Sequence, residues 1–192
     1  MELSSAFVEQ LEKLKIISDQ EIEKVLSYFI LEKLNPNDFF LNLGERCYSL
    51  GFLEKGILRT FIHDSDGNEI VKYFIDDNIL FTDIRSYEDS KPAQINIQAI
   101  TSCQILTIKK QENNKLKLKV PKWENVLNIL ATKSLTQMID KQNFLHMGSA
   151  IEKYQYFIKH FPNLAQNVPL KYISSYLGIT QSSLSRIRNQ WK

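Results

Sequence analysis

The stretch PLKYISSYLGITQSSLSRIRNQWK, from Pro169 to Lys192, decides the fold class that we expect for this chain. Its apolar residues recur at the three- and four-residue spacing of two short helices. They form two groups: Ile173 and Leu177, then Leu184, Ile187 and Trp191. Gly178 stands between the groups, where a sharp turn needs a positive φ angle that is costly for a residue with a side chain. The stretch therefore predicts a helix-turn-helix.

The second of these helices is expected to present polar side chains outward. Thr180 is its predicted N-cap, because the hydroxyl can accept the backbone N–H of Ser182 or Ser183. With the apolar residues inward, the outward residues are Gln181, Ser182, Ser185, Arg186 and Asn189. These types suit the DNA major groove, since arginine donates to guanine and glutamine pairs with adenine. Three further residues suit DNA phosphates, which fix register without reading sequence: Lys171, Ser183 and Arg188.

Charge is divided unevenly along the 192 residues, although the net charge is only +2. Residues 1–114 hold 12 Lys and Arg against 19 Asp and Glu, a net charge of −7, whereas residues 115–192 hold 12 against 3, a net charge of +9. Such asymmetry predicts that the C-terminal half meets a polyanion. The alternative is a set of helical surfaces whose cations are merely solvated.

The composition, with 43% hydrophobic and 24% charged residues, is that of a soluble globular protein of one large or two small domains. Residues 1–25 mix acids with apolar residues, unlike a secretion signal. No apolar run approaches the roughly 18 residues that span a bilayer, so we expect a cytoplasmic protein without a membrane partner. Cys47 and Cys103 are too few for a CxxC pair, a zinc site or an iron–sulfur cluster, so we expect no metal and no cofactor.

The middle of the chain has the texture of short β-strands. A helix precedes it, with Ser18 and Glu21 as a capping box and Pro36 as its expected end. Between Phe39 and Lys110, the runs GILRTFIH and EIVKYFI flank DSDGN, which predicts a hairpin. The later run INIQA alternates apolar with polar residues. Several such strands predict a sandwich, a barrel or a roll.

Helices are expected again after the strands. Residues 122–161 contain no proline, and Gly148 with Ser149 is the natural break, because glycine ends helices and serine starts them. The first helix would have roughly 25 residues and a length of ~37 Å, so we expect its apolar stripe to pack on a second subunit. Three residues interrupt a strict heptad: Lys133, Gln137 and Lys141. Packing along its own domain is the alternative.

Two stretches resemble a known family. VPLKYISSYLGITQSSLSRIRNQ resembles the C-terminal winged-helix segment of the Crp/Fnr superfamily of bacterial transcription regulators, above all in LGIT and LSRIR. LNLGERCYSLGFLEKGILRTFIHDSDGNEIVKYF is similar to the family's N-terminal double-stranded β-roll, including Gly44-Glu45, Lys55-Gly56 and DGNE. The resemblance covers nearly the whole chain.

The resemblance implies an α+β fold with an N-terminal, jelly-roll-like double-stranded β-roll, a long dimerisation helix and a C-terminal winged helix-turn-helix. Residues 1–115 would form a cyclic-nucleotide-binding-like sensor domain, residues 116–148 the linker and dimerisation helix, and residues 149–192 the DNA-binding domain. It also implies a homodimer that binds a palindromic operator in double-stranded DNA. An activator of this family would in addition contact RNA polymerase.

Carried over by the resemblance, the family's base-contacting positions fall on Gln181, Ser182 and Arg186. Only Arg186 keeps the residue type of the cyclic-AMP receptor protein, whose other two positions are arginine and glutamate. We therefore expect a different operator preference.

The family's cyclic-nucleotide site has a glycine and a glutamate, followed by an arginine that neutralises the cyclic phosphate. The corresponding stretch here is FTDIRSYEDSKPAQINIQA, with these candidate pocket residues: Phe81, Thr82, Asp83, Ala93 and Gln94. Thr82 and Asp83 replace the glycine and the glutamate, and Ala93 or Gln94 falls at the arginine position. Because neither can neutralise a phosphate, we expect that cyclic AMP does not bind in the usual way. The roll would then hold another effector, respond to a partner or be a structural relic.

The sequence leaves alternatives to DNA binding. A small-molecule sensor whose output is a protein contact would leave the basic tail secondary. An enzyme would need an acid–base set, for which the candidates are His63, Asp83, Glu88 and Asp89. The sequence has no nucleophile–base pair, metal-spaced cluster or phosphate-cradling glycine loop, so we expect no enzyme. Haem ligation would fall to a histidine: His63, His146 or His160.

Overall fold

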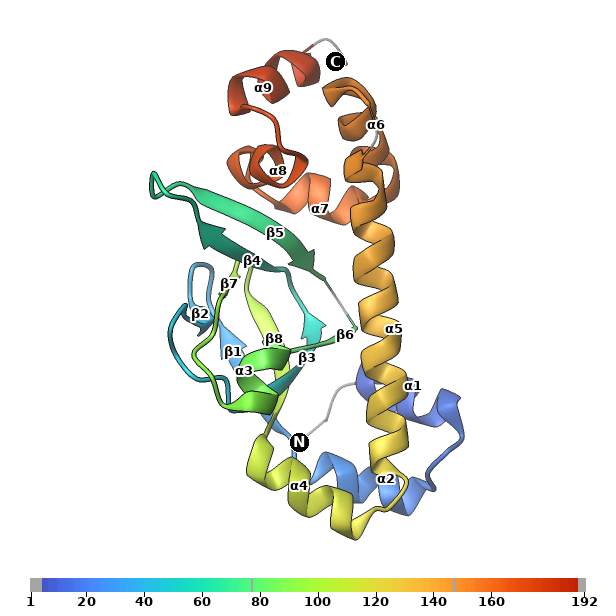
Figure 1. The fold of residues 1–192 in the computed structure, drawn as a ribbon. Helices are drawn as coiled ribbons and strands as arrows, with labels where there is room; N and C mark the ends of the chain where they lie inside the picture. The colour runs from blue at the N-terminus through green and yellow to red at the C-terminus, as the bar shows by residue number, and fades with distance from the viewer. Residues whose placement is uncertain (1–4, 77, 147, 190–192) are drawn as a thin grey trace.

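The computed structural model describes residues 5–76, 78–146 and 148–189. Two N-terminal helices lie at one end, a β-roll occupies the middle, and a helical domain lies at the other end (Figure 1). The long helix α5 (Trp123–Asn143) runs beside the roll and joins the two ends. The predicted α+β class, with its β-roll and long helix, is confirmed.

The N-terminal helices are α1 (Ser5–Leu14) and α2 (Asp19–Leu26). The predicted capping box is present, because the Ser18 hydroxyl accepts the Glu21 N–H and the Glu21 carboxylate accepts the Ser18 N–H at 2.8 Å. The prediction that Pro36 ends this helix is wrong. The helix ends at Leu26, and Ile30 begins a strand that pairs with a distant one, so long-range pairing overrides the local helical pattern.

The roll consists of two antiparallel sheets, which have the strand orders β1-β8-β3-β6 and β2-β7-β4-β5 in the described residues. The strands of the first sheet are β1 (Ile30–Leu34), β8 (Cys103–Lys109), β3 (Ser49–Lys55) and β6 (Ile79–Phe81). Those of the second are β2 (Phe39–Leu41), β7 (Asn96–Ala99), β4 (Leu58–His63) and β5 (Glu69–Ile75). The predicted hairpin is confirmed as β4 and β5, which pair from Leu58 with Ile75 to His63 with Glu69.

The space between the two sheets is filled by aliphatic side chains that are fully buried: Leu53, Leu58, Ile97 and Ile105. The alternation expected in INIQA does not leave its polar residues in solvent. Asn96 and Gln98 of β7 are buried as well, and both have hydrogen-bond partners. The Asn96 side chain accepts a hydrogen bond from the Leu43 N–H, and the Gln98 side chain accepts one from the Arg59 guanidinium. Buried polar groups of this kind need such partners.

Helix α4 (Lys110–Lys119) follows the roll and packs with α5 on the N-terminal helices. Trp123, at the start of α5, is fully buried and donates its indole N–H to Asn113, 2.9 Å away. The long helix has 21 residues. A short 3-10 helix, η1 (Phe144–His146), follows it, and the predicted break is confirmed by a capping box of Ser149 and Glu152.

The C-terminal domain contains the helices α6 (Ala150–His160), α7 (Pro162–Asn167), α8 (Leu170–Leu177) and α9 (Gln181–Asn189). Between residues 150 and 189 the structure has no strand, so the wing implied by the resemblance is not among the described residues. Trp191, predicted to hold the last helix down, lies outside them. In the described residues, none of the helices is long and apolar enough to cross a membrane.

Candidate nucleic-acid interface and ligand groove

Helices α8 and α9 form the predicted helix-turn-helix. Gly178 ends α8 in the left-handed conformation with φ +67°, where a side chain would be strained. The N–H groups of Gly178 and Ile179 donate back to carbonyls of the last turn, which satisfies the end of the helix. The turn therefore depends on the residue that the sequence indicated.

A cluster of hydroxyl groups caps α9. The Thr180 hydroxyl accepts the Ser183 N–H at 3.1 Å, as predicted for an N-cap. It also lies 2.8 Å from the Ser183 hydroxyl and 3.0 Å from the Ser182 hydroxyl. The free N–H groups and the helix dipole make the start of α9 a region that favours anions.

One face of α9 is buried and the other is exposed, as predicted. Leu184 is fully buried and Ile187 is 7% exposed, and both belong to the core that holds the domain together. Six residues of α9 are exposed: Gln181, Ser182, Ser185, Arg186, Arg188 and Asn189. Glu152 is the only acidic residue from position 149 to the end of the sequence, so this surface is cationic. The helix lies at the end of the molecule farthest from α4 (Figure 1).

The remaining candidate DNA-binding residues lie beside α9 or within its cap. Ser183 is half-buried and engaged with Thr180. Lys171 lies in the first turn of α8 and is exposed, with its ammonium 4.6 Å from the centroid of the Tyr172 ring. The structure thus places the nine candidate residues on two consecutive helices and the turn between them, and their contact with DNA stays a prediction.

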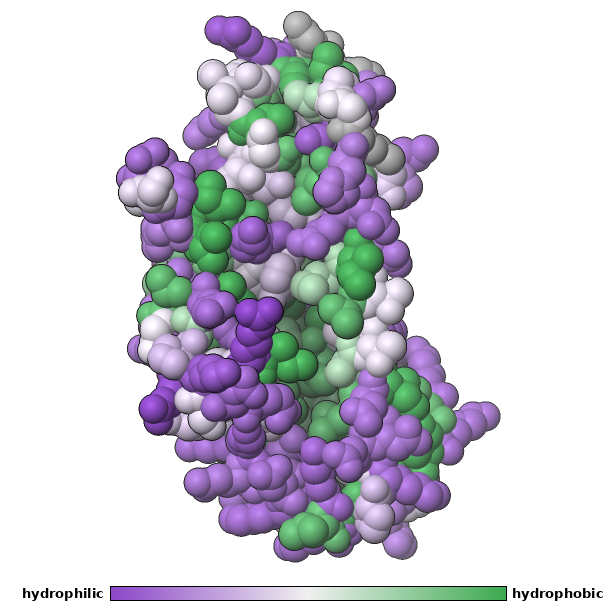
Figure 2. All heavy atoms as spheres, in the orientation of Figure 1, coloured by the Kyte–Doolittle hydropathy of each residue, from purple (hydrophilic) through white to green (hydrophobic). Residues whose placement is uncertain are grey.

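A groove of about 510 Å³ separates the roll from α5. Figure 2 shows it as a hollow with apolar residues between the roll and the long helix. Two of the five candidate pocket residues, Phe81 and Thr82, line it. Much of the rest of its lining is apolar and includes Ile75, Leu127, Leu135 and Met138.

The cations that line the groove already have carboxylate partners. Lys117 donates to Glu124 at 3.0 Å, and Lys141 forms an ion pair with Asp76. A phosphate group in the groove would therefore have to compete with an existing ion pair for either lysine.

Asp83, Ala93 and Gln94, the other candidate pocket residues, are not among the residues that line the groove. Asp83 is the N-cap of α3 (Ile84–Asp89), and its carboxylate accepts the N–H groups of Ser86 at 3.0 Å and of Gln94 at 3.2 Å. Ala93 forms two backbone hydrogen bonds with the Gly44-Glu45 turn. These residues therefore have structural roles at the end of the roll.

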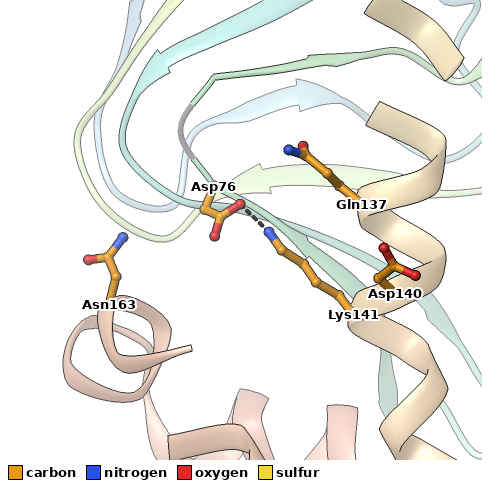
Figure 3. Close-up of a pocket in the computed structure, with 5 residues that line it drawn as sticks. All are labelled: Asp76, Gln137, Asp140, Lys141 and Asn163. Carbon is orange, nitrogen blue, oxygen red and sulfur yellow. Dashed lines mark hydrogen bonds and ion pairs between the residues drawn. The ribbon is translucent and has the colours of Figure 1, made fainter. Parts of the chain in front are cut away.

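A second, polar cleft of about 470 Å³ lies where the roll, α5 and α7 meet, and its residues are shown in Figure 3: Asp76, Gln137, Asp140, Lys141 and Asn163. Lys141 connects three parts of the molecule there. Its ammonium pairs with Asp76 after β5, and its carbonyl accepts the Tyr176 hydroxyl of α8 at 2.7 Å. Burial raises the pKa of Tyr176 well above its ordinary value, so this donor stays protonated.

Several of the residues considered as an acid–base set or as haem ligands contact other side chains. Asp89 pairs with Lys91 at 3.1 Å, and Glu88 lies 4.0 Å from Lys110. His63 contacts the ring of Phe61, and His160 stacks on Tyr156 at 4.0 Å. Within the described ranges, no three His, Cys, Asp or Glu residues are placed to hold a metal ion.

Sequence reasoning missed two groups of residues. The first consists of the residues of α5 that line the groove. The apolar stripe of this helix was expected to pack on a second subunit, with packing along its own domain as the alternative, and Val126, Leu127 and Leu130 pack in the core of their own chain. The second joins α8 to the roll through Arg59, Tyr172 and Ser175. An arginine in the middle of the apolar run ILRTFI was the one signal of the second group, since a buried charge needs a partner.

No family model and no curated protein sequence matches the chain. Solved structures do. FixK2 from Bradyrhizobium japonicum is 17% identical with a TM-score of 0.68, over 84% of this chain and 83% of that one. The c-di-GMP-responsive global regulator CLP from Xanthomonas campestris is 12% identical with a TM-score of 0.68, over 91% of each chain. A chain from Eubacterium rectale described as a Crp/Fnr-family transcriptional regulator is 15% identical, also with a TM-score of 0.68, over 91% of this chain and 83% of that one.

These similarities establish the fold. The chain has the architecture of Crp/Fnr-type transcription regulators, as its sequence resemblance implied.

Proposed function

We propose that this protein is a sequence-specific DNA-binding transcription regulator that acts as a homodimer. The observation that carries the proposal is the exposed face of α9. It combines two amides, two hydroxyls and two arginines with no acidic residue, on a helix whose other face is buried. Arg186 would donate to guanine, and Gln181 would pair with adenine in the major groove. The cap at Thr180 would lie near a phosphate.

Arg186→Ala tests this face. The DNA probe is the duplex that the wild-type protein selects from a random pool, and Lys159→Ala on α6 is the control because it removes one exposed charge from the same domain. We expect Arg186→Ala to weaken binding by at least tenfold, in line with the ~1–3 kcal/mol of a bidentate base contact, and to relax preference at one base pair per half-site. Equal effects of the two variants would show that α9 does not read bases.

The dimer would form through α5. Ile129, Thr132, Thr136 and Ile139 follow the 3-4-3 spacing of a coiled-coil seam, and Ile129 and Ile139 are 37% and 48% exposed in the single chain. Two of the three residues that interrupt the heptad bond within their own subunit. Lys133 donates to Gln10, and Lys141 pairs with Asp76, so neither charge interferes with the seam.

Ile139→Glu tests the seam by placing a charge in it. We expect sedimentation of the wild type as a dimer and of this variant as a monomer, because a carboxylate buried between two helices has no partner. Ile30→Glu is the control, since Ile30 is 59% exposed on β1. A dimeric Ile139→Glu variant would exclude this surface as the interface.

The groove supports a ligand other than a cyclic nucleotide. Its lysines are paired with Glu124 and Asp76, and Ala93 and Gln94, at the position of the family's arginine, carry no charge. An uncharged, largely apolar effector fits such a lining better than a phosphate does. Calorimetric titration with cyclic AMP and cyclic GMP tests this directly. We expect no binding heat, and micromolar affinity for either nucleotide would refute the interpretation.

A further inference from the structure

One face of α8 is turned toward the roll. Tyr172, Ser175 and Tyr176, at positions i, i+3 and i+4, lie on this face and contact β4, β5 and the end of α5. We call these three residues the roll contact. Figure 1 shows α8 between β5 and α9, so the roll contact and the recognition helix are on opposite sides of α8.

Ser175 bonds to the free edge of a sheet. β5 is the last strand of its sheet, so its outward N–H and C=O groups lack a neighbouring strand. The Ser175 hydroxyl accepts the Val71 N–H and donates to the Glu69 carbonyl, both at 2.9 Å. The Ser175 side chain thus makes hydrogen bonds of the kind that a neighbouring strand would make with Val71 and Glu69.

Tyr172 covers a buried arginine. The Arg59 guanidinium lies 3.7 Å from the centroid of the Tyr172 ring and is 1% exposed. It is held by two bonds to the Glu69 carboxylate, at 2.6 and 2.9 Å, and by Gln98. Because Glu69 and Gln98 hold the guanidinium in place, the Tyr172 ring packs on a group with a fixed position.

Tyr176 completes the contact at the long helix. Its hydroxyl donates to the Lys141 carbonyl, and its ring centroid lies 5.0 Å from that of Phe74 in β5. The roll is itself fastened to α5, because the Leu80 N–H of β6 donates to Ser134 at 3.1 Å. The helix-turn-helix is therefore held by the roll and by α5, in addition to the short covalent connection through Gly148.

We propose that the roll contact is a positioning device that fixes the distance between the two recognition helices of a dimer. The proposal rests on the function proposed above. Two half-sites are read together only when their recognition helices are roughly 34 Å apart. A domain tethered by a short connection alone would search many orientations, which lowers the effective concentration of the second helix at its half-site. Tyr172 and Ser175 are thus positioning residues that do not touch DNA.

The test compares four duplexes: the palindrome that the wild type selects from a random pool, one half-site alone, and two palindromes with two base pairs added to or removed from the centre. The variant is Tyr172→Leu combined with Ser175→Ala. Tyr172→Phe is the control, because it keeps the aromatic ring on Arg59. Half-site binding also reports whether the domain is folded.

We expect the double variant to bind the half-site as the wild type does and to lose at least tenfold in affinity for the palindrome. It should also discriminate less between the three spacings, while Tyr172→Phe keeps the wild-type preference. Unchanged spacing discrimination, or tighter binding of the palindrome, would overturn the proposal. If half-site binding is lost, Ser175→Ala alone repeats the test, because its side chain is only half-buried. If the wild type selects no DNA at all, it is the proposed function that fails.

Discussion

Removal of the Arg59 side chain is the perturbation for which the structure supports the most detailed expectation. The guanidinium makes two bonds to Gln98, at 2.9 and 2.6 Å, and two to Glu69. It also stacks on the rings of Phe61 and Tyr172, at 4.0 and 3.7 Å. In Arg59→Met the chain length and much of the packing are kept, but every one of these charge-assisted interactions is lost.

The loss of unfolding free energy depends on which partners of Arg59 can form new hydrogen bonds with water. The carbonyl oxygen of buried Gln98 loses both of its guanidinium donors, which costs about 1–3 kcal/mol. The side chain of Glu69 is 38% exposed and can turn to water, so its share is reduced. With the cation–π contacts at about 1 kcal/mol or more, we expect a loss near 3 kcal/mol, at the lower end of the ~3–5 kcal/mol for breaking a buried pair.

Urea unfolding at neutral pH measures this difference. Lys91→Met is the control, because Lys91 and its partner Asp89 are 71% and 53% exposed and should contribute less than about 0.5 kcal/mol. A loss below about 1 kcal/mol in Arg59→Met would show that the buried network is energetically neutral and would refute the reasoning.

The same pair of proteins gives a test in pH. The hydrogen bonds from Arg59 hold the pKa of Glu69 below its ordinary value of 4.5. A lowered folded-state pKa contributes stability that is present above pH 4.5 and is lost as the pH falls through the folded-state value. The difference between wild type and Arg59→Met should therefore shrink below pH 4.5. A difference that stays constant through this range would show that the Glu69 charge does not participate.

Four further substitutions test the fold. Gly56→Ala should destabilise by more than about 3 kcal/mol, because φ is +113° and the new Cβ would lie 2.6 Å from the Cys103 sulfur, whereas Gly67→Ala, with φ +82° and open space, should cost only about 1–2 kcal/mol; thermal unfolding compares them. Thr180→Ala removes the cap of α9 and should lower the free energy of unfolding in urea by about 1 kcal/mol. An unchanged free energy of unfolding would show that the cap does not stabilise α9. Leu184→Ala leaves a cavity in the C-terminal core and should cost about 2–4 kcal/mol; a loss below 1 kcal/mol would contradict full burial of that side chain.

Some strands of the roll could be predicted from local sequence patterns, and others could not. The hairpin of β4 and β5 could be predicted because its turn residues and β-branched flanks act within a few residues of one another. The start of β1 at Ile30 could not, because its residues adopt extended structure only through pairing with β8, more than 60 residues later in the chain. The burial of Gln98 was equally hidden, since its partner Arg59 lies 39 residues away.

The helix-turn-helix is the part that the sequence determined by itself. The spacing of Ile173, Leu177, Leu184 and Ile187, the positive φ angle at Gly178 and the hydroxyl of Thr180 are all local, and each functions as predicted in the fold. The polar face of α9 follows from them without knowledge of any distant residue.

Only the tertiary structure decided how that unit is held. Ser175 meets Val71 across 104 residues of sequence, and the Tyr176 hydroxyl reaches the Lys141 carbonyl of another helix. Neither contact has a sequence signal, because a serine or a tyrosine on a helix surface is compatible with solvent as well as with a partner. Local chemistry fixes the recognition helix, whereas its position relative to the roll depends on the edge of β5 and on the end of α5.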